Sequence, residues 1–399
     1  MSYRKVFSDL KFFDDFSLLM KNFSFPVSKN DLLGAGAIRV GEDFLEFDDK
    51  NKLKSVLSVI DKGLCHLKNN VTNKPAIYLH QGLGIPLIGH VGFGIIDRGT
   101  NAIEVKPVTG CNLKCVFCSV DQDLRSRDFV IEEEFLISEL EKLLILKRNK
   151  CYIFINAHGE PLFYSPLNRL IRDLKYNKKV KEVILITNAS LLSKTKIDEF
   201  LECGLDQINV SIHSLDQNRS KLLSGVKGYD LTAILDIIIY AKNKGIRVVV
   251  APVVLFGSKK LERASLESNE KDMFDIARFC KEQRIFFSAQ NYLSYKLGKR
   301  ISKEKSFEEF YVFLDKIKEM YGNDIFNLAM EITKDDVLKN PFRKGEIVRL
   351  EKNFKGFLES ECICVLRDRL ISALGKVNKN NFNAKIIRTK DNIIKGIIL

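Results

Sequence analysis

Three of the nine cysteines of this 399-residue chain lie within eight residues, at Cys111, Cys115 and Cys118, and this spacing restricts the fold more than any other feature. Residues 102–108, just before them, form a β-like run that ends in a Thr-Gly turn, so the three thiols are expected on a loop directly after a strand. Three thiolates from one tight loop can bind three irons of a [4Fe-4S] cluster, whereas electron-transfer clusters ordinarily take four cysteines. The fourth iron then stays open, as the free position of a catalytic metal does.

A structural zinc site is the alternative use of these thiols. Zinc takes four ligands, usually in pairs at C-x2-C or H-x3-H spacing. Cys362, Cys364 or one of the five histidines would have to supply the fourth ligand, because no second pair at zinc spacing lies close by in the sequence. The spacing therefore favours the cluster. The colour of anaerobically purified protein separates the two, because a cluster is brown and zinc is colourless.

Helical and strand-like patterns alternate from residue 131 to about residue 300. Residues 132–148 carry leucines on one helical face, and residues 151–155 are a continuous apolar strand. Further strands are predicted at 183–186, 207–212, 246–255 and 285–293. This alternation is the pattern of parallel βαβ units. Polar residues directly after the strands are therefore expected to gather at one edge of the sheet.

The sequence Cys-x3-Cys-x-Phe-Cys on a loop after a strand resembles the signature of the radical S-adenosylmethionine (SAM) superfamily, and the resemblance covers roughly residues 96–300. It implies an α/β fold with a partial (β/α)6 TIM-like barrel. It also implies that the three cysteines bind a [4Fe-4S] cluster whose open iron chelates the amino and carboxylate groups of SAM. In that family, one electron from the reduced cluster cleaves SAM to methionine and a 5′-deoxyadenosyl radical, which abstracts hydrogen from a substrate. The chain is accordingly expected to be an enzyme.

The resemblance extends to the ends of further strands. The segment 158–161 resembles the Gly-Gly-Glu-Pro sequence that binds the SAM amino group, with His158 in place of the first glycine, and the segment 187–189 resembles Thr-Asn-Gly, with Ala189 in place of glycine. The cofactor-binding residues that the resemblance implies are Gly159, Glu160, Pro161, Thr187, Asn188, Ser211, His213 and Val253. The alternatives are a helix-entry acid for Glu160 and a helix-capping strand end around Ser211. No residue that acts on the substrate is identified.

The polar stretch after the cysteines contains two arginines, Arg125 and Arg127. Both are candidates for contact with an anionic substrate or with the SAM carboxylate. Solvated loop charges are the alternative.

Residues 1–95 are expected to form an N-terminal α+β segment. Residues 12–20 are short, apolar and predicted to be helical, and residues 49–67 place apolar side chains at helical spacing. The glycine-rich stretch, residues 82–101, predicts turns and short strands that lead into the first barrel strand. A phosphate-binding loop is the alternative for the glycine-rich stretch, but no G-K-[ST] sequence follows it.

Residues 340–399 differ in texture from the barrel region at 96–339, because short apolar pieces alternate with turn residues. Such a pattern predicts a small β-barrel. The sequences around 344–348 and 394–396 weakly resemble a TRAM domain, a β-barrel appended to RNA-modifying enzymes. This tail has 13 Lys and Arg against 6 Asp and Glu, so it carries +7 of the chain's formal charge of +13. A basic module of this kind suits phosphate binding.

These observations predict a radical SAM enzyme that uses a [4Fe-4S] cluster and SAM to modify RNA, with tRNA as the leading substrate. Modification of a protein or small metabolite is one alternative, and a non-catalytic iron-sulfur electron-transfer protein is another. An electron donor such as ferredoxin or flavodoxin is the expected partner. No apolar run reaches membrane-spanning length and residues 1–7 lack the apolar core of a signal peptide, so a cytoplasmic protein is expected. The sequence leaves the reaction outcome and the oligomeric state open.

Overall fold

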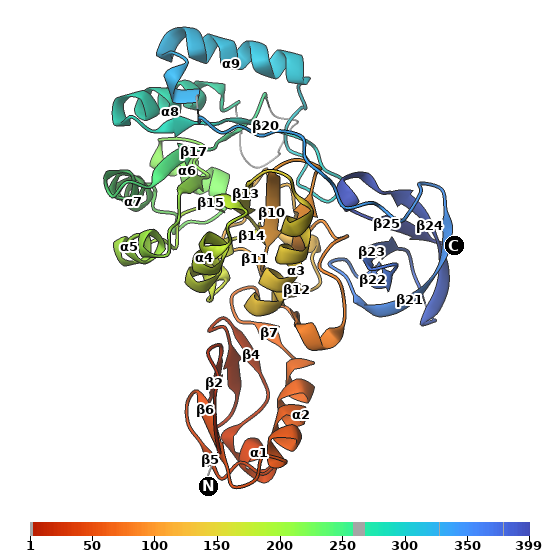
Figure 1. Cartoon of the computed structure of the whole chain (residues 1–399). Coiled ribbons are helices and arrows are strands. Elements are labelled where there is room, and N and C mark those ends of the chain that lie inside the picture. The colour runs from red at the N-terminus through yellow and green to blue at the C-terminus, as the bar shows by residue number, and fades with distance from the viewer. Residues whose placement is uncertain (1–2, 258–267, 327, 378) are drawn as a thin grey trace.

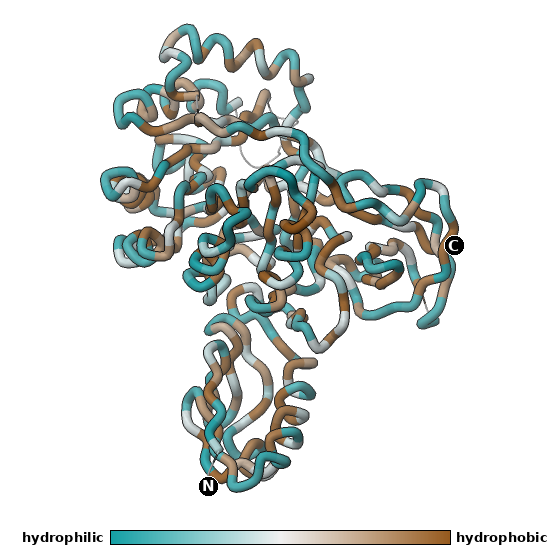
Figure 2. Tube along the Cα trace, viewed as in Figure 1, coloured by the Kyte–Doolittle hydropathy of each residue, from teal (hydrophilic) through white to brown (hydrophobic). Residues whose placement is uncertain are grey.

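The computed structural model describes residues 3–257, 268–326, 328–377 and 379–399. Figure 1 shows a central α/β body, with the N-terminal part below it and the C-terminal β-barrel to its right in this view. Figure 2 shows that apolar residues are concentrated on the strands of the body, while the surrounding helices alternate between apolar and polar residues. The core therefore lies between the sheet and the helices.

The α/β body is built on a seven-stranded sheet in which six adjacent strands are parallel. A seventh strand, β9 (Gly94–Asp97), is antiparallel to the first of them at one edge. The parallel strands, in sheet order from that edge, are β10 (Ala102–Lys106), β13 (Cys151–Ile155), β15 (Val180–Thr187), β16 (Gln207–Val210), β17 (Arg247–Val250) and β19 (Phe286–Phe287). This arrangement confirms the predicted α/β fold and partial (β/α)6 barrel.

The two faces of this sheet differ in chemistry because side chains alternate along each strand. On the outer face, Val105 and Ile155 are 0% exposed and share one hydrophobic core with Leu140 of a covering helix. The helices of the body are α3 (Glu133–Leu146), α4 (Leu167–Tyr176), α5 (Lys194–Glu202), α6 (Gln217–Ser224), α7 (Leu231–Asn243), α8 (Glu270–Gln283) and α9 (Phe307–Tyr321). Among the described residues, no helix is both long and apolar enough to cross a membrane.

Three short strand pairs extend the body at its edges. The strand β11 (Thr109–Gly110), which leads into the cysteine loop, pairs with β14 (His158–Gly159). The other two pairs are β8 (Ala76–Leu79) with β12 (Asp128–Ile131), and β18 (Val253–Val254) with β20 (Gln290–Asn291). All three pairs are parallel. The pairs β11–β14 and β18–β20 continue the parallel arrangement beyond the ends of β10 and β13 and of β17 and β19.

The N-terminal part contains two antiparallel sheets and two helices. Its elements are β1 (Tyr3–Val6), β2 (Leu10–Phe12), β3 (Ser17–Leu19), β4 (Phe23–Phe25), α1 (Lys29–Gly34), β5 (Arg39–Val40), β6 (Phe44–Phe47), α2 (Lys52–Leu64) and β7 (Lys68–Asn69). The helix predicted within residues 49–67 is confirmed by α2. The helix predicted at residues 12–20 is wrong, because this segment connects β2 to β3 and its apolar side chains enter the core from a hairpin.

The C-terminal part is a closed five-stranded barrel, as the short strands of the tail predicted. Inward-facing Val348, Ile371 and Ile386 form its own core. Its strands are β21 (Ile347–Lys355), β22 (Glu361–Leu366), β23 (Arg369–Leu374), β24 (Asn381–Arg388) and β25 (Lys395–Ile398). Figure 1 shows β22 and β23 on the side toward the body and β24 on the far side.

The glycine-rich stretch holds this small barrel against the body. Gly89 accepts a hydrogen bond from the Ile394 amide at 2.9 Å. A methyl group at Gly89 would lie 2.1 Å from the Leu370 carbonyl oxygen, and one at Gly92 would lie 1.9 Å from the ring of Phe357. The stretch continues into strand β9 and not into a helix, so it has the turns and short strands that were predicted and lacks the helix of a phosphate-binding loop.

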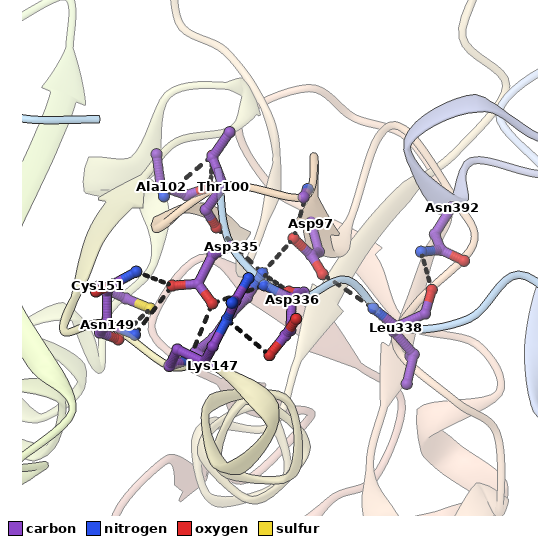
Figure 3. A network of polar contacts seen from close by, with 12 residues as sticks. Asp97, Thr100, Ala102, Lys147, Asn149, Cys151, Asp335, Asp336, Leu338 and Asn392 are labelled. Atoms are coloured by element: carbon purple, nitrogen blue, oxygen red, sulfur yellow. Dashed lines mark hydrogen bonds and ion pairs between the residues drawn. The ribbon is translucent and has the colours of Figure 1, made fainter. Parts of the chain in front are cut away.

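A buried network of hydrogen bonds and an ion pair connects the segment before the small barrel, around residues 335–338, to the lower end of the sheet (Figure 3). The Lys147 side chain is 0% exposed and its Nζ donates to Asp97 Oδ1 at 2.7 Å and to the carbonyl oxygens of Thr100 and Asp336 at 3.1 and 2.6 Å. Asp335 accepts hydrogen bonds from the backbone and side chain of Asn149, each at 3.0 Å. All three donor positions of the lysine are thus occupied.

Candidate functional site

The cysteine loop follows β11 and is supported from below by the end of α6. The Lys114 amide donates to the Ser224 carbonyl at 2.9 Å, and the Val116 amide donates to the Leu223 carbonyl at 3.0 Å. Gly225 ends α6 with a φ of +69°, and a methyl group there would lie 2.3 Å from the Lys114 carbonyl oxygen. The loop therefore rests on a helix end that only glycine allows at this distance.

The three cysteine thiols are half-buried and close enough to influence one another. Burial raises the pKa of Cys111 to about 12, and the nearby Cys118 raises it further. Burial also raises the pKa of Cys115, with Cys111 and Cys118 acting in the same direction. Thiolates in this position need positive charge from a metal centre to form, and cluster irons supply that charge.

The number and type of these ligands fit a [4Fe-4S] cluster with one iron left open. Within the described part of the chain, no three His, Cys, Asp or Glu side chains are grouped closely enough to hold a single metal ion. In a [4Fe-4S] cluster each thiolate binds a different iron, so three thiolates leave one iron without a protein ligand. The donor set of Cys111, Cys115 and Cys118 therefore fits the cluster that the sequence implied.

Glu160 lies beside this loop and is 1% exposed. Its carboxylate accepts hydrogen bonds from the Thr187 hydroxyl at 2.6 Å, the Asn188 amide at 2.8 Å and the Leu162 amide at 3.1 Å. Burial raises the pKa of Glu160 to about 7, against the effect of these three donors. The two oxygens offer about four lone-pair sites, so one acceptor position remains for a further donor.

The neighbours of Glu160 in sequence have structural roles. Gly159 pairs with Gly110 in β11, and a methyl group at Gly159 would lie 1.8 Å from the Gly110 carbonyl oxygen. Pro161 is buried and begins a short 3-10 helix, for which Glu160 is the N-cap. His158, which replaces a glycine of the resembled motif, stacks on Phe357 of the small barrel at 6.1 Å between ring centroids. The substitution thus gives this loop a contact with the C-terminal part.

Asn188 connects the end of β15 to the cysteine loop. Its side-chain amide lies 3.9 Å from Cys111 Sγ and donates to Asn112 Oδ1 at 3.0 Å. Asn112 in turn donates to the Ser190 hydroxyl, which donates to Asn188 Oδ1 at 2.6 Å. This closed ring of three side chains fixes the distance between β15 and the first cysteine.

Ser211 and His213 come from the end of β16 and line one small cavity with Cys115 and Asn188. The His213 Nδ1 accepts a hydrogen bond from the Val253 amide at 3.1 Å, so in the neutral ring Nε2 carries the proton. Burial lowers the pKa of His213 to about 3, which keeps the ring neutral. Its ring also packs edge-on against Phe117 of the cysteine loop, at 4.5 Å between centroids.

The structure therefore brings the sequence-predicted residues to one edge of the sheet. Asn188, Ser211 and His213 share the cavity with Cys115, while Glu160 and Thr187 are hydrogen-bonded around the Asn188 end of β15. Val253 reaches the site through its backbone amide. Gly159 and Pro161 shape the Glu160 loop and line no part of this cavity.

Arg125 does not take either of the roles expected from the sequence. It is 4% exposed and forms an ion pair with the fully buried Asp128 at 3.0 Å. Asp128 also accepts from Thr109 at 3.0 Å and from Asn69 at 2.9 Å. Arg125 is thus neither a solvated loop charge nor a free anion receptor, because its charge is already neutralised inside the protein. Arg127 is half-buried, and burial lowers its pKa.

The sequence predictions missed the polar inner face of the partial barrel. Glu104 and Lys106 alternate with the buried apolar residues of β10, and Gln207 and Asn209 do the same in β16. Register places Glu104 opposite Phe154, and the pairing continues across the sheet to Gln207. The period-two alternation in both strands is the signal that could have found them.

Known proteins with similar sequences support the cofactors that this site suggests. The sequence profile of the radical SAM superfamily matches residues 105–268. An uncharacterised protein of Methanocaldococcus jannaschii is 34% identical over 370 residues, which cover 85% of this chain and 84% of that protein. GTP 3′,8-cyclase of Listeria monocytogenes is 27% identical over 185 residues, and the match spans 46% of this chain and only 51% of the cyclase.

Among solved structures, SAM-bound SuiB of Streptococcus suis is similar with a TM-score of 0.41 and 13% identity, over 80% of this chain and 69% of that one. The profile match begins within β10 and runs through the cysteine loop, the Glu160 loop and the ends of β15, β16 and β17. Every residue discussed above for the cluster and for SAM falls inside it. The chain therefore belongs to the radical SAM superfamily and is an enzyme whose cofactors are a [4Fe-4S] cluster and SAM.

Proposed function

We propose that this enzyme uses SAM to modify RNA by radical chemistry, with tRNA as the leading substrate. When bound, the cluster supplies the electron that converts SAM to methionine and a 5′-deoxyadenosyl radical. Cys111, Cys115 and Cys118 would hold three of its irons. A reducing cytoplasm with ferredoxin or flavodoxin as electron donor suits this chemistry, and all nine cysteines are free thiols.

The side chains around the cysteine loop have separate tasks in this proposal. The remaining acceptor position of Glu160 would bind the ammonium group of SAM. Asn188, through its backbone amide and its side chain, keeps that carboxylate at a fixed distance from Cys111. His213 would donate from Nε2, since its Nδ1 is already engaged by Val253. The Ser211 hydroxyl lines the same cavity and supplies a further polar contact.

The observation that carries the choice of RNA is the open basic side of the C-terminal barrel. The barrel contacts the body through Phe357 and Leu370, which belong to the core of the body. Arg349 of β21 and Lys385 of β24 point outward and are exposed, on the strands that Figure 1 shows away from the body. Phosphates would bind such a face, and the proposal assigns no base stacking to it because Phe342 and Phe357 are buried.

The test is 5′-deoxyadenosine formation by anaerobically reconstituted protein with SAM, dithionite and a tRNA pool. We expect formation to rise with tRNA and to be lost in Cys115→Ala, while the exposed Cys65→Ala control behaves as wild type. The double variant Arg349→Gln/Lys385→Gln should weaken tRNA binding and lower the slope of log affinity against log salt by about two. A wild-type protein that ignores tRNA at low salt would refute the RNA substrate.

A small phosphorylated nucleotide is the second candidate substrate. GTP 3′,8-cyclase of Listeria monocytogenes matches 46% of this chain, and the polar inner face of the barrel offers hydrogen-bonding groups that a nucleotide needs. The same assay separates the candidates, because deoxyadenosine formation would then rise with nucleoside triphosphates and not with tRNA.

A further inference from the structure

Positive charge collects where the small barrel meets the open edge of the α/β body. Glu104 accepts from Arg98 at 2.6 Å and from Lys106 at 3.2 Å. Asp391 of the small barrel accepts from Arg98 at 3.2 Å and from Arg388 at 3.3 Å. Two carboxylates are thus shared among three cations that come from both parts of the molecule.

Lys395 adds a cation that has no carboxylate partner in the described residues. It begins β25 next to Ser372 and Arg388, and it lies on the outer face because Ile394, its neighbour in sequence, is in the core of the small barrel. It is half-buried. Burial lowers the pKa of Lys395, and the nearby Arg388 and Lys296 lower it further.

The one carboxylate that favours the charge of Lys395 is that of Glu361, and it already accepts hydrogen bonds from other groups. Glu361 accepts from the Phe357 amide at 2.7 Å, from His90 at 3.3 Å and from the Ser372 hydroxyl. Its pKa is lowered to about 2, because these donors outweigh the opposing effect of burial. Glu361 therefore belongs to the interface, and Lys395 remains available to an outside anion.

This charge lies next to the SAM site. Lys106 ends β10, five residues before Cys111, and His158 directly precedes Gly159 and Glu160. Lys106 and Lys395 both lie close enough to His158 to lower its pKa, in addition to the larger effect of burial. The cations therefore flank the loop that holds Glu160.

Five basic residues together form what we call the cationic seam: Arg98, Lys106, Lys296, Arg388 and Lys395. We propose that the cationic seam is a phosphate-binding site for the substrate, with Lys395 as the direct phosphate contact. Its five cations face three carboxylates, Glu104, Asp391 and Glu361, so it has an excess of two positive charges that a phosphate or polyphosphate would neutralise. The C-terminal barrel thereby completes the active site with a residue of its own.

This proposal deepens the proposed function, because it rests on a phosphorylated substrate but not on whether that substrate is RNA or a nucleotide. Inorganic tripolyphosphate tests it without assuming either source. We expect the reconstituted full-length protein to bind tripolyphosphate in a calorimetric titration, and Lys395→Gln to weaken binding about tenfold, since a hydrogen bond to a charged group is lost. Lys395→Arg should retain binding, and Lys316→Gln on the exposed side of α9 should leave it unchanged.

Wild-type protein that does not bind tripolyphosphate, or Lys395→Gln protein that binds it as wild type does, would overturn the proposal. A second titration with labelled tRNA identifies the phosphate source. Competition between tRNA and tripolyphosphate supports the seam as an RNA site. If tripolyphosphate binding depends on Lys395 but the protein does not bind tRNA, the cationic seam binds the phosphates of a small substrate. That result would refute RNA as the substrate and leave the phosphate-binding proposal standing.

Discussion

Glu160 is held by three hydrogen-bond donors in surroundings that exclude water, and its replacement by glutamine tests its role directly. The amide group of glutamine would have to turn its NH2 toward one of the three donors, Thr187, Leu162 or Asn188. The remaining acceptor position, which we propose for the SAM ammonium group, would also lose its charge. We expect Glu160→Gln to lower SAM affinity tenfold or more, because charge-assisted hydrogen bonds are the strong ones.

Equilibrium dialysis of SAM against the reconstituted variant measures this loss, together with iron and sulfide analysis. Cluster content should stay as in wild type, because Glu160 is not among the three thiol ligands. Glu134→Gln, on the exposed side of α3, is the matched control. Unchanged SAM affinity in Glu160→Gln would remove Glu160 from the SAM site.

At the same scale, short motifs carried most of what the sequence could predict about the site. Glu160, Thr187 and Asn188 were named from their motifs, and the structure joins them by direct hydrogen bonds. Lys106 and Lys395 were not named as site residues, because no motif of the active site contains them and the TRAM-like segment 394–396 assigns no role to Lys395. Lys106 shares the polar face of its strand with Glu104, whereas Lys395 gains its place only when two distant parts of the chain pack together.

At the scale of elements, the glycine-rich stretch decides whether the small barrel can dock. A methyl group at Gly92 would overlap the Phe357 ring at 1.9 Å, and that ring also lies against Arg125 and His158. We expect Gly92→Ala to loosen the barrel and to cost about 1–3 kcal/mol, as overpacking of a filled interface does. Limited proteolysis between the body and the barrel, followed with time, would show faster cleavage in the variant.

Gly228→Ala is the control for this experiment, because nothing lies within 4 Å of a methyl group there and its φ is not in the left-handed region. Equal cleavage of wild type and Gly92→Ala would mean that the ring of Phe357 can move aside without loss of docking.

Elements with long, uniform patterns were predicted well. Residues 151–155 are a continuous apolar run, and such a run identifies a buried strand of the parallel sheet. The hairpin of β2 and β3 was mistaken for a helix, because three-residue strands are too short to show a period of two. The docking of the small barrel could not be predicted, since it depends on contacts between residues 88–93 and residues far away in the chain.

At the scale of the whole molecule, the Lys147 network ties the segment that leads to the small barrel to the underside of the sheet. Lys147 and Asp97 are both fully buried and form an ion pair at 2.7 Å. Asp97 also receives the Leu338 amide at 3.4 Å, and the Leu338 carbonyl accepts from Asn392 of the small barrel at 2.8 Å. The chain of contacts in Figure 3 therefore runs from α3 to the C-terminal part.

We expect Lys147→Met to destabilise the protein by about 3–5 kcal/mol, because it leaves the Asp97 carboxylate buried without its counter-charge and two carbonyl oxygens without their donor. Thermal unfolding followed by circular dichroism measures the loss, and Lys150→Met, at an exposed position of the same connection, should change stability by less than about 0.5 kcal/mol. The double variant Lys147→Met/Asp97→Asn should recover part of the loss, since the unpaired charge is gone. If Lys147→Met alone unfolds at the wild-type temperature, the buried ion pair does not hold the segment, and the small barrel is held by its other contacts, such as those of the glycine-rich stretch and the Arg98–Asp391 ion pair.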